Sequence, residues 1–256
     1  MKESLKNKLN KGDITIGSWI TLSHPSIPEI MSKAGFDWLT VDMEHSAITI
    51  AQAQPLIQVI ESSGCVPLVR VGENDPNLIK RVMDAGATGV IVPMVNTKED
   101  ADRAVKAVKY PPFGARGVGL ARAQGYGFEF NKYKEWVQKE SVVIVQIEHI
   151  EAVENLEEIL AVEGVDGFIV GPYDLSGSMG RPGEFEHQDV KDALKRVLQT
   201  SKKLNKPAGF HVIPPDAEVL LGKIKEGYKF LGFSLDTLFL GHSCREQMGK
   251  VSKGIK

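Results

Sequence analysis

The stretch RVMDAGATGVIV, Arg81–Val92, decides the fold. A helix-periodic segment runs up to Gly86, and an apolar run that begins at Gly89 follows after two residues. Glycine readily adopts the left-handed conformation that ends many helices, so the pattern predicts a helix, a glycine cap and a strand. The same order recurs in EIMSKAGFDWLTV, ILAVEGVDGFIV and KIKEGYKFLGF, with Gly35, Gly164 and Gly227 in the cap position. The chain therefore repeats a helix-to-strand unit.

Apolar runs predict eight strands, with helical patterns between most of them. The strands fall near Ile14–Ile20, Trp38–Met43, Val66–Val71, Gly89–Met94, Val142–Ile147, Gly167–Gly171, Pro207–Val212 and Phe230–Leu235. Eight alternating β/α units in 256 residues are typical of a TIM barrel, and we predict one (β/α)8 domain over residues 1–256. A doubly wound open sheet is the alternative. It is disfavoured because no G-x-G-x-x-G motif follows a strand.

One segment, PPFGARGVGLARAQGYGFEF (Pro111–Phe130), breaks this rhythm. It is glycine-rich and carries Arg116 and Arg122. Segments of this length inside a compact domain are usually lids or linkers. Because the β/α rhythm resumes after it, we predict a lid or a pocket wall.

Composition and charge limit the class of partner. The chain is 42% hydrophobic and 25% charged, with a formal net charge of −2 and interspersed signs, so it has no basic stripe for nucleic acid and no polybasic patch for lipid. Cys65 and Cys244 lie far apart, which argues against a disulfide framework and a zinc–thiolate site. The N-terminal residues lack the apolar core of a signal peptide, and no run reaches the roughly 18 apolar residues of a membrane helix. We expect a cytoplasmic protein that binds small molecules or copies of itself.

Polar residues gather at the ends of the predicted strands, where TIM barrels carry their active sites. They are His45 in VDMEH, Arg70 in the third strand, Gln146 and Glu148 in VQIEH, and Asp174 after the sixth strand. Because successive strand residues point to opposite faces, Gln146 and Glu148 share the interior face. The sequence therefore predicts a polar site at this rim.

Glu148 needs a compensating positive charge, because an unpaired buried carboxylate costs at least several kcal/mol. Asp174 is expected at the same rim, and two carboxylates so close repel each other unless a cation lies between them. A hard divalent cation, Mg²⁺, Mn²⁺ or Co²⁺, fits such oxygen ligands. The alternative is a structural ion pair between Glu148 and Arg70.

The other candidates suggest acid–base chemistry. The planar fork of Arg70 suits a substrate carboxylate. His45 is a candidate base at neutral pH, and Asp84 orients it if the helix after the third strand brings the two together. No predicted strand contains a lysine, which disfavours Schiff-base chemistry.

These residues resemble those of the HpcH/HpaI class II pyruvate aldolases, which act on 2-keto-3-deoxy sugar acids and other 4-hydroxy-2-oxo acids. The resemblance covers nearly the whole chain, and its most specific motifs are YPPFGARGVG and GPYDLSGSMG. It implies a divalent metal and reversible cleavage of the oxo acid to pyruvate and an aldehyde through a metal-stabilised enolate. It also implies a homohexamer whose subunits exchange C-terminal helices.

The resemblance implies a role for each matching position. Glu148 and Asp174 correspond to the metal ligands, and Gln146 and Asp174 to substrate contacts. Arg70 corresponds to the residue that binds the pyruvate-derived carboxylate and stabilises the enolate.

His45 corresponds to the proposed base, with Asp84 raising its basicity, and a metal-bound water is the alternative base. Tyr173 departs from the family pattern, which has a small residue before the metal ligand. We expect Tyr173 to contact the substrate and to reshape the pocket wall.

Two other functions stay open. One is a related lyase or decarboxylase that forms the same kind of enolate from another oxo acid or a thioester. The other is a barrel that binds a ligand without turnover.

Overall fold

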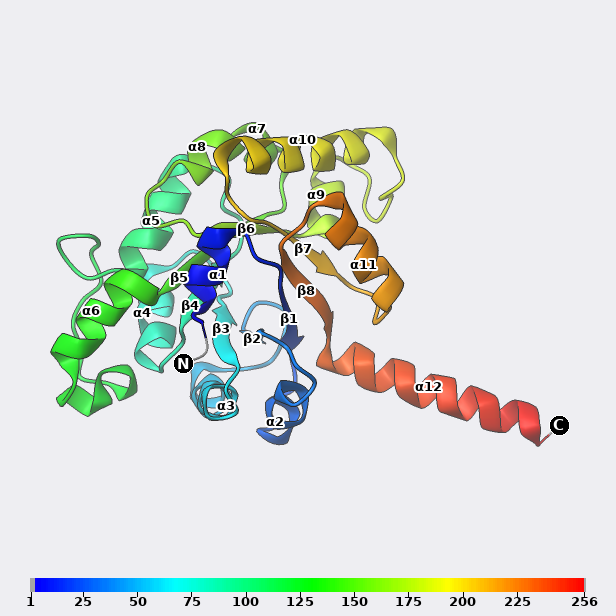
Figure 1. Cartoon of the computed structure of the whole chain (residues 1–256), viewed down its shortest axis with the longest axis horizontal. Coiled ribbons are helices and arrows are strands. Elements are labelled where there is room, and N and C mark those ends of the chain that lie inside the picture. The colour runs from blue at the N-terminus through cyan, green and yellow to red at the C-terminus, as the bar shows by residue number, and fades with distance from the viewer. Residues whose placement is uncertain (1–2, 256) are drawn as a thin grey trace.

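The eight predicted strands form a closed barrel. In a computed structural model of the chain, which describes residues 3–255, neighbouring strands pair in parallel in chain order and β8 returns to β1 (Figure 1). The strands are β1 Thr15–Ile20, β2 Trp38–Asp42, β3 Val66–Arg70, β4 Gly89–Val92, β5 Val142–Ile147, β6 Gly167–Val170, β7 Ala208–Val212 and β8 Phe230–Leu235. Each lies within the residues predicted for it, so the (β/α)8 prediction is confirmed.

Helices surround the barrel, and α1 (Leu5–Lys11) lies across the end where the strands begin (Figure 1). They are α1 Leu5–Lys11, α2 Ser26–Ser32, α3 Ile50–Ser62, α4 Pro76–Asp84, α5 Lys98–Val108, η1 Arg122–Gly127, α6 Phe130–Glu140, α7 Ile150–Glu154, α8 Leu156–Leu160, α9 Pro172–Ser178, α10 Gln188–Leu204, α11 Ala217–Glu226 and α12 Asp236–Gly254. The four glycines of the repeated unit have φ between 96° and 113°, in the left-handed region. Gly227 caps α11 and Gly86 directly follows the last turn of α4, as predicted, whereas Gly35 and Gly164 lie two and three residues past the caps of α2 and α8, in the turns that lead to the next strand.

The barrel interior is apolar at one end and polar at the other. At the N-terminal ends of the strands, the Trp38 ring stacks on Phe230 with centroids 4.3 Å apart, in the same cluster as Leu5 and Leu9 of α1. At the C-terminal ends, interior positions carry Asp42, Arg70 and Gln146 instead, and all three are buried. The apolar end stabilises the fold, and the polar end is where TIM barrels carry chemistry.

The glycine-rich segment Pro111–Phe130, for which the sequence predicts a lid or a pocket wall, does not cover the polar end of the barrel; its residues Pro111 and Phe113 line a hollow at the other end. It follows α5, so it lies at the N-terminal ends of the strands, whereas lids come from the connections that follow strands. Arg116 anchors it there: the guanidinium is fully buried, pairs with Asp84 and lies 4.7 Å from the ring centroid of Tyr110. A connection that follows a helix lies at the rim opposite one that follows a strand. The sequence pattern did not establish which kind of connection Pro111–Phe130 is.

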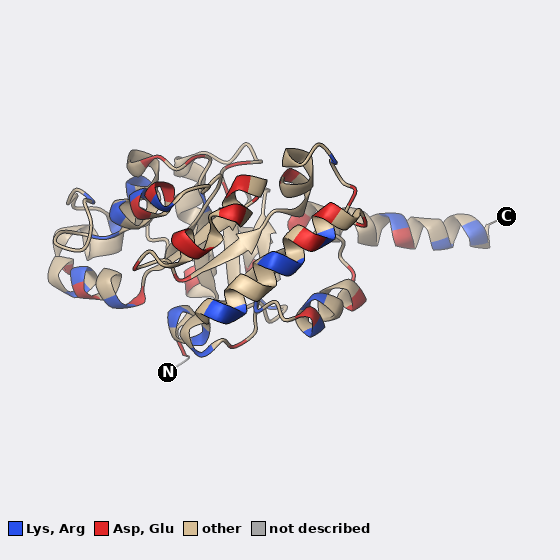
Figure 2. Ribbon diagram, turned by 90° about the horizontal axis from the view of Figure 1, so that it is seen from above, with Lys and Arg blue, Asp and Glu red and all other residues tan. Residues whose placement is uncertain are grey.

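The C-terminal helix α12 leaves the barrel and extends into solvent (Figures 1 and 2). Its side chains Leu240, Met248 and Val251 are more than half exposed. Basic and acidic residues are interspersed along this helix and along the barrel helices (Figure 2). Within residues 3–255, no helix is both long and apolar enough to cross a membrane.

We predict that Gly17→Ala destabilises the barrel by about 1–3 kcal/mol. A Cβ at Gly17 would lie 2.0 Å from Cδ2 of Trp38, whose ring is held by its stack on Phe230. Urea unfolding measures the change. Gly222→Ala is the matched control, because its Cβ meets nothing and alanine favours the helix, so its stability should rise by up to about 1 kcal/mol. Equal stability of Gly17→Ala and wild type would contradict the tight packing.

Candidate active site

A cavity of about 210 Å³ opens at the C-terminal ends of the strands. Its walls include five of the predicted site residues: His45, Arg70, Gln146, Tyr173 and Asp174. The other walls are Trp19, Ile169, Val170, Gly171, Pro172, His211 and Ile213. Side chains from six of the eight β/α units thus meet at one point, as the strand-end argument predicted.

Asp42 holds Arg70 in this cavity. Arg70 Nε and Nη2 donate to the two carboxylate oxygens of Asp42 at 2.9 and 2.7 Å. Burial alone would raise the pKa of Asp42, but the hydrogen bonds and charge of Arg70 outweigh it, and the pKa is lowered. Arg70 Nη1 also lies 3.2 Å from Glu44, and among residues 3–255 no ion pair joins Arg70 to Glu148. The alternative that Arg70 compensates Glu148 is therefore wrong.

Glu148 is a buried carboxylate whose hydrogen bonds come from uncharged donors. Its oxygens accept from the Gln146 side chain and, at 2.7 Å, from the backbone N–H of Met94. A Cβ at Gly171 would lie 3.1 Å from Glu148 Oε2, so a glycine here makes room for the carboxylate. Burial raises the pKa of Glu148, and the nearby charge of Asp174 adds to this.

Glu44 is a site residue that our sequence argument did not select. Burial raises its pKa to about 7, and the charges of Glu148, Asp42 and Asp174 add to the increase, against the opposing charge of Arg70. The cavity therefore concentrates more negative charge than Arg70 neutralises. The VDMEH motif already indicated Glu44, because strand alternation points both Asp42 and Glu44 into the barrel. Only His45 of this motif was selected as a candidate.

His45 lies at the mouth of the cavity with 64% of its side chain exposed. Its backbone N–H donates to Asp42 at 3.2 Å, and its Nε2 lies 3.8 Å from Glu44. Asp84 is at the other end of the barrel, in the last turn of α4, where it pairs with Arg116 and accepts a hydrogen bond from Gln124. Within the chain Asp84 therefore does not orient His45, because a helix that follows a strand ends at the opposite rim.

The Tyr173 ring stands at the edge of the cavity. It packs edge-to-face on Phe185, with centroids 4.9 Å apart, and is 53% exposed. Together with Pro172, His211 and Ile213, it also lines a larger, mainly apolar cavity of about 580 Å³ between α10 and α11. Tyr173 is thus part of the wall between the two spaces, and its effect on the shape of the substrate pocket stays a prediction.

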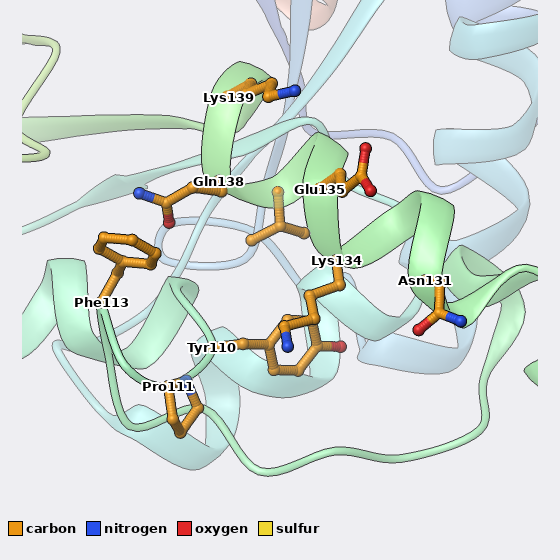
Figure 3. A pocket seen from close by; sticks show the side chains of 9 residues that line it. Tyr110, Pro111, Phe113, Asn131, Lys134, Glu135, Gln138 and Lys139 are labelled. Carbon is orange, nitrogen blue, oxygen red and sulfur yellow. The ribbon is translucent and has the colours of Figure 1, made fainter.

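A hollow of about 490 Å³ lies elsewhere, between Pro111–Phe113 and α6 (Figure 3). Its walls carry Lys134, Glu135 and Gln138, and no predicted site residue. It belongs to the N-terminal end of the barrel, because α6 leads into the start of β5. This position separates it from the polar cavity.

Comparison with known proteins gives consistent matches. Residues 15–242 match the HpcH/HpaI aldolase/citrate lyase family. A 2-keto-3-deoxy-L-rhamnonate aldolase of Escherichia coli O6:K15:H31 (strain 536 / UPEC) is 35% identical over 252 residues, 97% of this chain and 93% of the aldolase.

Two solved structures extend the comparison. An HpcH/HpaI aldolase/citrate lyase family protein from Burkholderia cenocepacia J2315 has a TM-score of 0.92 at 32% identity, covering 97% of this chain and 98% of its own. The citrate synthase SbnG has a TM-score of 0.86 at 27% identity, covering 99% of both chains. The whole barrel, including the polar end, is thus shared with these proteins.

We predict that Glu44→Gln stabilises the metal-free protein at pH 8 but not at pH 4. The folded-state pKa of about 7 exceeds 4.5, the ordinary value, so the wild type loses stability as the pH rises from about 4.5 to about 7. Removing the charge should recover at most about 3 kcal/mol at pH 8. Urea unfolding in chelator at both pH values measures the difference.

Glu163→Gln is the control for this pH dependence, because Glu163 is exposed in a turn, and it should change stability equally at both pH values. A gain for Glu44→Gln that is as large at pH 4 as at pH 8 would show that burial of the charge is not its cause.

Proposed function

This chain belongs to the HpcH/HpaI aldolase/citrate lyase family, and we propose that it is a metal-dependent class II aldolase. Its reaction is the reversible cleavage of a 4-hydroxy-2-oxo acid, of the 2-keto-3-deoxy sugar acid type, to pyruvate and an aldehyde. The observation that carries the proposal is the buried carboxylate of Glu148, whose pKa the nearby charge of Asp174 raises, next to a cavity lined by Asp174 and Arg70.

The donor set of the cavity fits a divalent cation. Glu148 is 3% exposed, and Asp174 is close enough for its charge to raise the pKa of Glu148. Within residues 3–255 no three His, Cys, Asp or Glu side chains converge on one point, so Glu148 and Asp174 would hold the ion and leave positions open for substrate oxygens. Bound there, Mg²⁺, Mn²⁺ or Co²⁺ would supply Lewis-acid stabilisation of negative charge on the substrate.

Arg70 and Gln146 bind the pyruvate half of the substrate in this proposal. Asp42 already occupies the Nε–Nη2 edge of Arg70, so the remaining N–H groups of Nη1 and Nη2 are the ones that meet the substrate carboxylate. Gln146 donates to Glu148 and keeps its carbonyl oxygen for another contact. Both side chains are held before substrate arrives, which lowers the cost of orienting it.

His45 is the proposed base. In the cleavage direction it takes the proton from the C4 hydroxyl, the C3–C4 bond breaks, and the aldehyde leaves. The electron pair of that bond stays on C3 as the enolate of pyruvate, and protonation at C3 completes the reaction. The exposed position of His45 lets it exchange its proton with solvent between turnovers.

A second candidate is a lyase or synthase that forms the same enolate and joins it to a different acid. The observation that favours it is the similarity to the citrate synthase SbnG. Product analysis with pyruvate and a panel of aldehydes and oxo acids separates the two functions.

The proposed assembly is a homo-oligomer in which α12 packs on another subunit, with a hexamer as the expected size. The exposed apolar side chains of α12 support this, because a helix that extends from its own barrel has no apolar surface to cover them.

We predict that removal of divalent cations abolishes pyruvate release from 2-keto-3-deoxy acids, and that Mg²⁺, Mn²⁺ or Co²⁺ restores it. Borohydride with pyruvate should leave the enzyme active, because no strand of the barrel carries a lysine. A coupled assay of pyruvate measures both effects. Full activity after exhaustive chelation, or a reduced pyruvate adduct on a lysine, would refute the proposed chemistry.

We also predict that Arg70→Lys lowers kcat/KM about 100- to 1000-fold, because lysine keeps the charge but loses the fork. The loss of unfolding free energy should be far too small to unfold the enzyme at 25 °C. Arg103→Lys is the control, since Arg103 forms an exposed ion pair with Asp100 and should retain activity within about twofold. Retention of wild-type turnover by Arg70→Lys would exclude Arg70 from substrate binding.

A further inference from the structure

The mainly apolar cavity of about 580 Å³ between α10 and α11 has no part in the proposed reaction. The rings of Phe210, on β7, and Tyr228, just before β8, are buried in its wall with centroids 5.0 Å apart. Leu194 and Leu198 line it from α10, and Val219, which is 40% exposed, lines it from α11. An apolar space of this volume is in the range of sites that enclose small organic ligands.

The charged side chains around this cavity carry one positive charge in excess. Three lysines and two glutamates line it, so with histidine neutral its formal charge is +1. Lys191 pairs with Glu186 at 2.6 Å, and Lys223 pairs with Glu226 at 2.9 Å. Within residues 3–255 the ammonium of Lys195 has neither an ion pair nor a hydrogen bond. Lys195 is therefore the positive charge that a ligand can use.

Lys223 holds a second cation against the apolar wall. Its Nζ lies 4.6 Å from the ring centroid of Phe210 and 5.8 Å from that of Tyr228, and 21% of its side chain is exposed. A partly desolvated cation attracts an anion more strongly than a cation in bulk water does. The cavity thus combines an apolar interior with a positive electrostatic potential.

We propose that this cavity binds a monocarboxylic acid with an apolar body, of the size of a medium-chain acyl group. The apolar body lies between α10 and α11, against Leu194, Leu198 and Phe210, and the carboxylate pairs with Lys195. One carboxylate matches the excess of one positive charge. An amine of the same shape would be repelled by that charge, and a neutral ligand would gain nothing from Lys195.

The site is separate from the catalytic cavity but shares a wall with it. Pro172, Tyr173, His211 and Ile213 line both cavities, and the Tyr173 ring is supported by its edge-to-face contact with Phe185. A ligand between α10 and α11 contacts the far side of this wall without entering the catalytic cavity. The inference therefore does not depend on the proposed reaction, which can fail without affecting it.

Isothermal titration calorimetry of the full chain with octanoate, butyrate and octylamine tests the proposal. Octanoate should bind about 10- to 100-fold more tightly than butyrate, because four additional CH₂ groups leave water. Octylamine has the same chain and the opposite charge, so it should bind at least about tenfold more weakly than octanoate.

Substitutions in the lining locate the ligand. Lys195→Gln should weaken octanoate binding about 3- to 10-fold and leave 1-octanol binding unchanged, because only the acid uses the charge. Val219→Gln should weaken both, and the partial exposure of Val219 lets the protein fold with this change. Lys203→Gln is the matched control on the same helix: Lys203 pairs with Glu157 outside the cavity, so both affinities should stay within about twofold of wild type.

Arg70→Lys distinguishes this site from the catalytic cavity, where Arg70 also suits a carboxylate. This variant should keep its octanoate affinity within about twofold of wild type. If Arg70→Lys loses octanoate binding and Lys195→Gln retains it, the acid lies in the catalytic cavity and the proposal is overturned. Equal affinities for octanoate and octylamine, or for octanoate and butyrate, overturn it as well.

Discussion

The bidentate ion pair between the Arg70 guanidinium and the Asp42 carboxylate fixes the geometry of the polar end of the barrel. Both carboxylate oxygens of Asp42 face the guanidinium, and one of them also accepts the backbone N–H groups of Glu44 and His45. The turn that carries the proposed base is thus tied to the residue that is proposed to bind the substrate carboxylate. Because the guanidinium also lies over the Trp19 ring, the same pair positions that ring in the wall of the cavity.

This arrangement leaves more negative than positive charge at the polar end of the barrel. Arg70 is shared by Asp42 and Glu44, and among residues 3–255 no direct ion pair reaches Glu148 or Asp174, although the charge of Arg70 acts on Glu148 from farther away. The raised pKa of Glu44 has burial as its largest cause, and the two distant carboxylates add to it. A divalent cation at Glu148 and Asp174 would remove that repulsion, so the metal proposal and the pH dependence of stability have one physical origin.

The sequence predicted the barrel closely because the strands depend on local signals. A glycine in the left-handed region and the apolar run after it are both visible in a short stretch such as Arg81–Val92. The rim residues of single strands, such as Arg70 and Gln146, follow from alternation. The contact between the Trp19 and His211 rings was not predictable, because β1 and β7 are separated by β8 and these side chains come together only when the barrel closes. Asp84 was misplaced although its position two residues before Gly86 puts it at the end of a helix that follows a strand, and such a helix ends at the rim opposite the site.

The two ends of the barrel use the same kind of ion pair for different purposes. Arg116 pairs with Asp84 and is enclosed by the rings of Tyr110 and Tyr133, so its side chain has no exposed surface and its contacts serve packing alone. The side chain of Arg70 keeps 10% of its surface exposed, toward a cavity. That small exposed edge allows a substrate to reach the N–H groups that Asp42 does not use. Both ends of the barrel contain a buried arginine–aspartate pair. The functional end is distinguished by the partial exposure of its arginine to a cavity.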